Sequence, residues 1–465
     1  VNPIDYVRVR VIKNKNDRYS ISKKNVSENL SWTEQKNHDE FVFSSTNVEP
    51  YEIEETTPPW HMGYPAIFIS AFASHQEVSV WALEIFKLEE TSKKTVSDLA
   101  KEITRDKSSK KSKIDTIIRW VQNEIRYMGI ESGIGAILPF QPIETIQQRF
   151  GDCKDKTLLL TALLNEIGIE AYPLLVNTSL LHEVATLPPA AQLFDHVIVY
   201  FEYQGEVYTV DATMPFQGGS LGKRAVYGYS NGLLVKKNEG IINIDYDPNK
   251  SKTETREVFE MDDFESPCSL TVITKLTGFN ADQMRMIFDM FSSRELSKEL
   301  MSVYSVLYDV SLLEKLEVTD DIENNIVTLV EQYQINSFFE KKEVAGEEVH
   351  LLHYEPVGLY QYISSLSCEP KLHPVYVPFP SNYYQKTNII LPEGLITPPE
   401  NTVIENDVFE YIYKQEVKNM YDLVLEYSFS TISNEIQNSS FNRVCRDMNQ
   451  IVQSLPLSLS YPVEP

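Results

Sequence analysis

A single cysteine at the start of a strongly apolar stretch is the residue whose setting best suggests chemical reactivity. Cys153 lies in the run GDCKDK, residues 151–156, directly before residues 157–167, whose apolar pattern predicts a helix. The positive end of a helix dipole and the unpaired backbone N–H groups there favour thiolate over thiol. Because the thiolate is the nucleophile, this setting predicts a reactive Cys153. The alternative interpretation is a small buried packing residue.

A histidine and an aspartate further along the chain are predicted to share one face of a hairpin. Residues 195–201 and 207–213 alternate as strands do, and Gln204-Gly205 between them suits a tight turn because glycine accepts positive φ. If the residues on either side of this turn pair with each other, His196 and Asp211 emerge on the same face as diagonal neighbours. That arrangement is close enough for a carboxylate–imidazole hydrogen bond.

These side chains match the requirements of a thiol nucleophile. His196 would accept the proton of Cys153, while Asp211 would fix the imidazole tautomer and favour the imidazolium. Each residue alone could be structural: His196 as a satisfied strand residue, Asp211 as a turn cap. A further possibility is that all three ligate zinc, although the hairpin pairing places Asp211 behind His196 as an orienting group. Their joint arrangement favours catalysis.

Several elements must position these groups. Apolar residues recur at three-and-four spacing from Ile114 to Ile125, which predicts an amphipathic helix, and Ser74 can cap a short helix over residues 75–86. The basic, Ser-rich run at residues 107–113 is a plausible boundary. The later part of the chain is mostly strand-like with some helix, for which a sandwich is the default architecture. We therefore predict three domains, at residues 1–106, 107–240 and 241–465.

Composition excludes several classes of function. The chain has 465 residues and a formal net charge of −25, which argues against binding nucleic acid or an anionic membrane surface. No apolar run approaches the ~20 residues that span a bilayer. The chain begins at Val1, so we expect a processed or partial sequence, and the absence of a targeting segment indicates little about compartment.

The four cysteines give no disulfide or metal pattern. They are far apart and form no CxxC pair: Cys153, Cys268, Cys368 and Cys445. Four cysteines in a chain of this length are not a disulfide scaffold, and clustered thiolates for zinc are absent. We predict no metal and no cofactor. The redox compartment stays open at this point.

Together these residues resemble the transglutaminase-like core of the papain-type thiol enzymes. The run GDCKDK with the apolar helix after it resembles the cysteine helix of that superfamily, and residues 194–197 and 210–213 resemble its histidine and aspartate strands. The resemblance covers roughly residues 108–235. It implies an α+β fold with the cysteine helix packed on an antiparallel sheet and β-rich, sandwich-like domains on either side. It also implies catalytic roles for Cys153, His196 and Asp211.

The implied chemistry is acyl transfer through a thioester on Cys153. Water would release an acid and an amine would give a new amide; we favour a cysteine peptidase or amidase acting on a protein or peptide, because no crosslinking-specific feature is visible. Two departures limit the resemblance. Lys154 stands where crosslinking transglutaminases usually carry an aromatic residue, and their oxyanion residue has only Tyr127 and Gln122 as candidates here. The backbone N–H of Cys153 is a more secure donor.

Both flanks add to the resemblance. Residues 48–81 resemble the end of an uncharacterised β-rich domain that precedes this core in many bacterial proteins, notably of Bacteroidetes, and the last part of the chain resembles a companion β domain. The relatives are usually exported, which implies the periplasm or cell surface, and the N-terminal strands of the first domain would be missing here. Alternatives to hydrolysis are a protein-glutamine transglutaminase and a catalytically idle cell-surface binding or assembly module.

Overall fold

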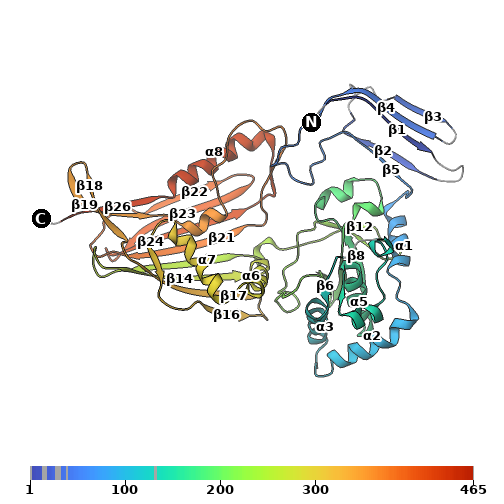
Figure 1. Ribbon diagram of the computed structural model, residues 1–465, viewed down its shortest axis with the longest axis horizontal. Coiled ribbons are helices and arrows are strands. Elements are labelled where there is room, and N and C mark those ends of the chain that lie inside the picture. Colours follow the sequence, from blue (N-terminus) through green and yellow to red (C-terminus); the bar gives the residue numbers. More distant parts are fainter. Residues whose placement is uncertain (1–2, 13–17, 27–32, 38–39, 130–132, 464–465) are drawn as a thin grey trace. The chain divides into compact units, whose positions relative to one another are not determined.

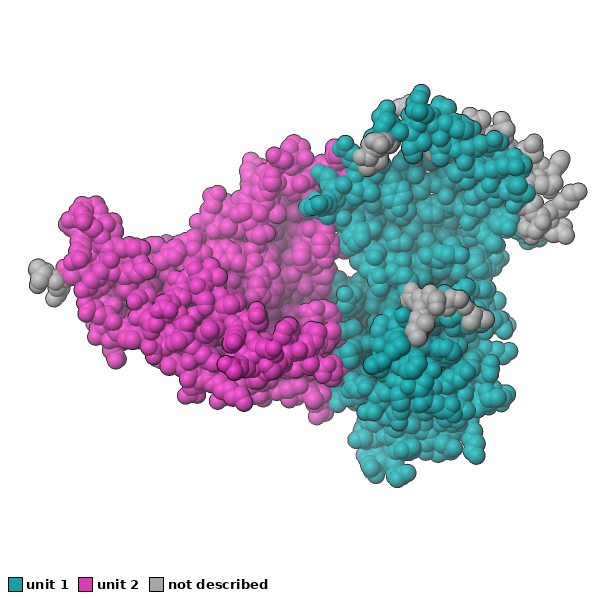
Figure 2. Space-filling model, viewed as in Figure 1, with its two compact units in different colours: residues 1–215, 226–246 teal, residues 216–225, 247–465 magenta. Residues whose placement is uncertain are grey.

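The chain folds into two compact units. The computed structural model describes residues 3–12, 18–26, 33–37, 40–129 and 133–463. Unit 1 comprises Val1–Pro215 and Val226–Tyr246, and unit 2 comprises Phe216–Ala225 and Asp247–Pro465 (Figures 1 and 2). Helices and antiparallel sheets occur in both units, so the predicted α+β class is confirmed. No helix within the described residues has the length and apolar character of a membrane span.

Unit 1 begins with two small antiparallel sheets and a helix. One sheet has the order β1-β4-β3 and the other pairs β2 with β5 (Figure 1). Their bounds are β1 Ile4–Ile12, β2 Ser20–Lys24, β3 Thr33–Asn37, β4 Glu40–Val48 and β5 Ala66–Ser70. Helix α1, His75–Ile85, follows, and Ser74 caps it as predicted by accepting a hydrogen bond from the backbone N–H of Glu77.

The rest of unit 1 is a helical layer packed on a five-stranded sheet. The helices are α2 Glu90–Ile103, α3 Lys110–Glu124, α4 Pro142–Gln148 and α5 Cys153–Glu166, and short β6 Arg126–Tyr127 pairs in parallel with β7 Phe150–Gly151. The sheet has the order β10-β9-β8-β11-β12 and is antiparallel throughout. Its strands are β8 Ala171–Val176, β9 His196–Tyr203, β10 Glu206–Val210, β11 Asn231–Leu234 and β12 Ile241–Asn243.

Helix α5 is the central helix of unit 1. It contacts α2, α3 and α4 on one side and β8 and β9 on the other. Eleven of its fourteen residues are buried, which explains why its sequence is apolar around most of the helix rather than amphipathic. The cysteine helix thus packs on an antiparallel sheet, as predicted. It begins at Cys153, earlier than the apolar pattern alone indicated.

Helix α3 confirms the amphipathic pattern and corrects one boundary. Ile114, Ile117, Ile118 and Val121 are fully buried, as their spacing predicted. The basic run at residues 107–113, interpreted as a spacer, instead contains the start of this helix. Ser109 accepts a hydrogen bond from the backbone N–H of Ser112 and so provides the N-cap. Lysines in a first turn concealed this start, because acidic residues are the usual helix-start signal.

Unit 2 is built on one nine-stranded sheet. Its order is β15-β17-β14-β13-β21-β24-β23-β22, with β16 also pairing with β17, and only β13 and β21 run parallel. These strands are β13 Thr253–Glu260, β14 Cys268–Thr277, β15 Val310–Leu312, β16 Glu317–Asp321, β17 Ile326–Ile335, β21 Asn382–Ile390, β22 Glu400–Glu405, β23 Phe409–Lys418 and β24 Asp422–Thr431. The long strands alternate buried and part-exposed residues, so one face of the sheet supplies the core.

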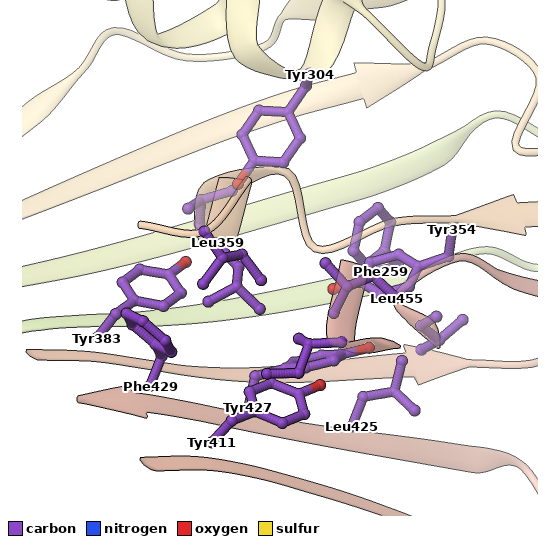
Figure 3. Packing of buried hydrophobic residues seen from close by; sticks show 14 of the residues in the cluster. Phe259, Tyr304, Tyr354, Leu359, Tyr383, Tyr411, Leu425, Tyr427, Phe429 and Leu455 are labelled. Carbon is purple, nitrogen blue, oxygen red and sulfur yellow. The ribbon is translucent and has the colours of Figure 1, made fainter. Parts of the chain in front are cut away.

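Helices and smaller sheets cover this face. The elements are α6 Phe279–Met290, α7 Ser293–Ser305, α8 Asn438–Ser454, the sheet of β18 Phe339–Val344, β19 Glu347–Tyr354 and β26 Leu457–Pro462, and the pair of β20 Val375–Tyr376 with β25 Glu435–Ile436. The core between them is rich in tyrosine, and the hydroxyl of Tyr304 points into it toward buried Glu257 at 2.8 Å (Figure 3). The predicted β-rich unit is therefore one large sheet covered largely by helices.

A disulfide joins a loop of unit 2 to α8 and was not predicted. Cys368 is bonded to Cys445 on α8, 77 residues further along the chain. Cys153 and Cys268 are free and buried. The number and spacing of the cysteines gave no sign of this bond, because two isolated cysteines meet here through tertiary packing alone.

Candidate active site

Cys153 is held at the N-terminus of α5 by a reciprocal capping box. The carboxylate of Asp152 accepts hydrogen bonds from the backbone N–H groups of Lys154 and Asp155, at 2.8 and 3.2 Å. The Asp155 carboxylate in turn accepts from the backbone N–H of Asp152 at 2.8 Å and of Phe140 at 2.7 Å. This box makes Cys153 the first residue of the helix, at the positive end of its dipole. The Asp-x-x-Asp pattern at residues 152–155 could have revealed it in the sequence.

The hairpin has the predicted register. Tyr203 pairs with Glu206, and both turn residues between them, Gln204 and Gly205, have positive φ, at 56° and 84°. The pairing continues to Val199 opposite Val210, which places Asp211 directly beyond the end of β10. The hairpin turn thereby determines which side chains face the cysteine helix.

His196 and Asp211 are in direct contact. The Nε2 atom of His196 lies 2.8 Å from Oδ2 of Asp211, and the side chains are 13% and 9% exposed. The thiol of Cys153 is close enough to His196 to raise the pKa of the imidazole, and both residues line one cavity. Since Asp211 occupies Nε2, the nitrogen left for the thiol is Nδ1. The structure thus brings together the three residues that the sequence singled out.

Further donors orient the Asp211 carboxylate. Its Oδ1 atom accepts from the backbone N–H and the hydroxyl of Thr213, at 2.8 and 2.7 Å, and its Oδ2 atom accepts from the hydroxyl of Tyr229 at 3.1 Å. The ring of Tyr229 also lies against His196, with 5.9 Å between ring centroids. Sequence analysis missed Tyr229, because no local pattern connects it with Asp211.

A buried threonine links the cysteine helix to the histidine strand. Thr157, one turn after Cys153 on α5, donates its hydroxyl to the backbone carbonyl of Val197 at 3.1 Å. Val197 follows His196 on β9. The bond therefore fixes the separation of the two elements next to the thiol and the imidazole.

A buried lysine stabilises the opposite side of the site. The ammonium of Lys156 is fully buried and donates to the backbone carbonyls of Gln122, at 3.2 Å, and Ile125, at the C-terminal end of α3. Burial lowers the pKa of Lys156 to about 8, although the nearby charge of Asp211 raises it. The side-chain amide of Gln122 donates to the backbone carbonyl of Asp211 at 2.9 Å. Lys156 and Gln122 thus support the segment that carries the carboxylate.

The electrostatics of the pair favour a charged imidazole. Burial lowers the pKa of His196, but the hydrogen bonds with Asp211 and Cys153 outweigh burial and raise that pKa to about 10. For Asp211, burial raises the pKa, but the hydrogen bonds from His196 and Thr213 outweigh it and hold the pKa below its ordinary value. Both shifts favour an imidazolium beside a carboxylate.

A cavity of about 330 Å³ lies beside Cys153 and His196. Most of its lining is apolar: Trp81, Ile85, Phe86, Ala136, Ile137, Leu175, Ala191, Phe194 and Val197. The charged side chains among its described lining residues are Lys154, Asp195 and His196.

Tyr127 and Gln122, the predicted oxyanion candidates, are placed differently from the three central residues. Tyr127 is 47% exposed on β6, and the amide of Gln122 contacts the Asp211 carbonyl. The described lining of the cavity includes neither side chain. The described residues also contain no group of three or more His, Cys, Asp or Glu side chains arranged to hold a metal ion.

Comparisons with known proteins agree with this fold. Residues 97–187 match the family model of the transglutaminase-like superfamily, a range that contains Cys153 and ends before His196. A crystal structure from Parabacteroides distasonis, described as a "putative protease", is similar over 99% of this chain and 73% of its own, with 11% identity and a TM-score of 0.63. At this identity the similarity concerns the fold alone.

A second structure, from Cytophaga hutchinsonii, is described as a "putative cysteine protease". It covers 45% of this chain and 72% of its own, with 14% identity and a TM-score of 0.22, which is too low to support an argument. Both structures come from Bacteroidetes. No curated protein matches the chain. Residues 97–187, which contain the start of the cysteine helix and its packing on the antiparallel sheet, are therefore similar to the transglutaminase-like superfamily.

Proposed function

We propose that this protein is a thiol hydrolase that cleaves peptide or carboxamide bonds, with Cys153 as nucleophile, His196 as acid and base, and Asp211 as the group that orients His196. The observation that carries the proposal is the 2.8 Å contact between His196 Nε2 and Asp211 Oδ2, combined with the position of Cys153 and His196 side by side in the wall of one cavity. The cavity beside these residues supplies access for a substrate. The order of thiol, imidazole and carboxylate is the one that a nucleophile, its base and the group orienting that base require.

The reaction would proceed in two steps. The thiolate of Cys153 attacks the carbonyl carbon and forms a C–S bond; the C–N bond then breaks as the imidazolium of His196 donates its proton to the leaving amine. Water next attacks the thioester while His196 accepts a proton from it. The C–S bond breaks, the acid leaves, and the thiolate–imidazolium pair is restored.

The electrostatics support the first step. A protonated His196 is required to release the amine, and its pKa of about 10 keeps it protonated at neutral pH. The backbone N–H of Cys153, in the first turn of α5, has no intrahelical acceptor and would stabilise the oxyanion. Tyr127 and Gln122 remain weaker proposals for this role.

Alkylation and turnover together test the proposal. Burial raises the pKa of the other free cysteine, Cys268, to about 12, so iodoacetamide at pH 6–7 should modify Cys153 selectively. His196→Ala should slow that modification, and Cys153→Ala should abolish cleavage in a peptide library. Equal modification of both free thiols would contradict the proposal. Mass spectrometry of products formed with an added amine separates hydrolysis from amine transfer.

We also propose that the protein is exported. Support comes from the Cys368–Cys445 disulfide, because such bonds persist in oxidising compartments. When the unmodified protein is denatured without reductant, thiol titration should detect two thiols. Titration after reduction should detect four. Four thiols before reduction, in protein purified from its own cells, would contradict export.

A further inference from the structure

We propose that the cavity beside Cys153 is a specificity pocket that selects an apolar side chain, aromatic or branched aliphatic, next to the attacked carbonyl of a peptide substrate. This inference rests on the proposed function and adds the class of substrate. Two observations support this inference: the side chains that form the walls of the cavity are mostly apolar, and the charged side chains in the walls already have partners.

The walls are apolar and adjoin the nucleophile. Trp81, Phe86 and Phe194 pack with Cys153 in a single hydrophobic cluster and stay partly exposed toward the cavity. Leu175 and Val197 contribute from β8 and β9. A volume of about 330 Å³ is at the lower end of the range of ligand pockets, roughly 300–1,000 Å³, which suits one or two side chains rather than a large cofactor.

The charged groups in the lining have partners already. The ammonium of Lys154 lies 2.6 Å from the Asp152 carboxylate. The carboxylate of Asp195 accepts from the backbone N–H and the hydroxyl of Thr178, both at 2.8 Å. A charged substrate side chain would lose hydration in this pocket and would have to compete for these groups, whereas an apolar one gains by leaving water.

One wall comes from outside the matched superfamily core. Trp81 and Ile85 belong to α1, which precedes residues 97–187. Ser79 fixes α1 to the core by donating its hydroxyl to the backbone carbonyls of Leu234 and Lys236, at 2.8 and 3.0 Å. The selectivity of the pocket therefore depends in part on a helix outside the matched range, and α1 is positioned firmly enough to provide that wall.

The test uses peptidyl acyloxymethyl ketones, which alkylate the thiolate by a C–S bond that replaces the C–O bond to a departing carboxylate. The probes carry Phe, Leu, Ala, Glu or Lys at either of the two positions before the ketone. The Phe or Leu probes should modify Cys153 about 10- to 200-fold faster than the Ala, Glu and Lys probes. Equal rates for all five side chains at both positions would overturn the inference.

Two neighbouring substitutions make the test specific. Ile137 is 52% exposed and lines the cavity, whereas Leu138 is 41% exposed and is not among the lining residues. Ile137→Asp should raise the ratio of the Lys-probe rate to the Phe-probe rate at least tenfold, since one lost apolar contact costs about that factor. Leu138→Asp should leave the ratio unchanged. This ratio cancels any change in the reactivity of the thiolate itself, and equal effects of both variants would contradict the assignment.

Iodoacetamide distinguishes the two levels of the proposal. If it modifies Cys153 but no peptidyl probe does, the thiol is reactive without a peptide site, and the proposed function fails together with the pocket. If every probe reacts at the same rate, the proposed function stands and only the pocket assignment fails.

Discussion

The charged imidazole of His196 depends on the carboxylate of Asp211. Asp211→Asn keeps the shape of the side chain but removes its charge, so the pKa of His196 should fall from about 10, since burial alone lowers it. With less imidazolium to protonate the leaving amine, kcat/KM should drop roughly 10²- to 10⁴-fold. The pH dependence of kcat/KM measures both effects. Asp98→Asn, which alters an exposed carboxylate on α2 outside the cavity lining, is the control.

The same pKa gives a signed prediction for stability. Because the pKa of His196 in the folded protein lies above its ordinary value of 6.5, its contribution is complete below about pH 6.5 and is lost as pH rises through about 10. The free energies of unfolding of the unmodified protein and of Asp211→Asn, measured with denaturant, should therefore differ most at about pH 5–6 and converge above about pH 10. A difference that grows toward alkaline pH would contradict the assigned charges.

Tyr229 is predicted to act as a positioning residue. Tyr229→Phe removes the 3.1 Å hydrogen bond to Asp211 but keeps the ring against His196. A hydrogen bond to a charged group contributes about 1.5–3 kcal/mol, so kcat should fall roughly 10- to 100-fold with little change in KM. Tyr227→Phe, at an exposed neighbour, should have a much smaller effect. A proportional rise in KM instead would indicate a role in substrate binding.

At the residue scale, the sequence predicted Cys153, His196 and Asp211 because each lies in a local pattern: a helix start and a two-residue hairpin. Tyr229 and Lys156 were missed for a physical reason. Their roles arise where separate segments meet, at the Asp211 carboxylate and at the C-terminal end of α3, and no spacing in the chain encodes those meetings.

At the scale of elements, the contact between α5 and β9 controls the distance from thiol to imidazole. Thr157→Val removes the hydroxyl that donates to the Val197 carbonyl, and we expect a loss of about 1–3 kcal/mol in the free energy of unfolding with slower alkylation of Cys153. Thr161→Val is a matched control on the next turn. Among the described residues, the buried Thr161 hydroxyl has no hydrogen-bond partner, so this change should be neutral or stabilising. Equal losses for both variants would refute a specific role for Thr157.

The elements of unit 1 were largely predictable from local sequence patterns, but not all of their ends were. Apolar periodicity located α3, and the alternating strands with Gln204-Gly205 gave the hairpin and its register. The start of α5 was placed too late, because the apolar run begins after the polar residues of the capping box. The strands of unit 2 were visible as strands, but their order in the nine-stranded sheet depends on distant pairings such as β13 with β21.

At the scale of the whole molecule, buried acids should make the stability of unit 2 depend on pH. Burial raises the pKa of Glu331 from 4.5 to about 7, although the hydroxyl of Tyr333, at 2.5 Å, lowers it. Because the pKa of Glu331 is higher in the folded than in the unfolded protein, protonation of Glu331 favours the folded state. Its contribution to the free energy of unfolding is complete below about pH 4.5 and is lost as pH rises through about 7. Glu331→Gln should flatten this part of the pH–stability curve, and Glu340→Gln, at an exposed site, should not. An unchanged slope in Glu331→Gln would contradict the prediction.

The division into two units was not accessible from the sequence, because the chain passes between them more than once. It leaves unit 1 after Pro215, contributes Phe216–Ala225 to unit 2, and returns at Val226. Such an excursion carries no local signal. The three predicted domains, at residues 1–106, 107–240 and 241–465, remain a proposal about the boundaries of independently folding parts.

Residues Phe216–Ala225 lie between Asp211 and Tyr229 in the chain, so we expect the contacts of this segment within unit 2 to affect the candidate active site. Gly218 donates its backbone N–H to the buried Asp282 carboxylate at 2.8 Å, and Asp282 forms an ion pair with Arg285 at 2.9 Å. A Cβ atom at position 218 would collide with Arg285 and Asn325. Gly218→Val should therefore displace the segment.

If the segment helps to place Tyr229 on Asp211, Gly218→Val should lower kcat/KM about 10- to 100-fold at a temperature where unit 2 stays folded, because small misplacements in an active site have effects of this size. Leu425→Ala is the matched control: it removes a fully buried side chain of the unit 2 core and should destabilise that unit by about 2–5 kcal/mol without touching the segment. Full activity in Leu425→Ala with loss in Gly218→Val would attribute the effect to the segment. Equal losses would instead show that activity follows the general stability of unit 2, and the segment would then have no specific part in the site.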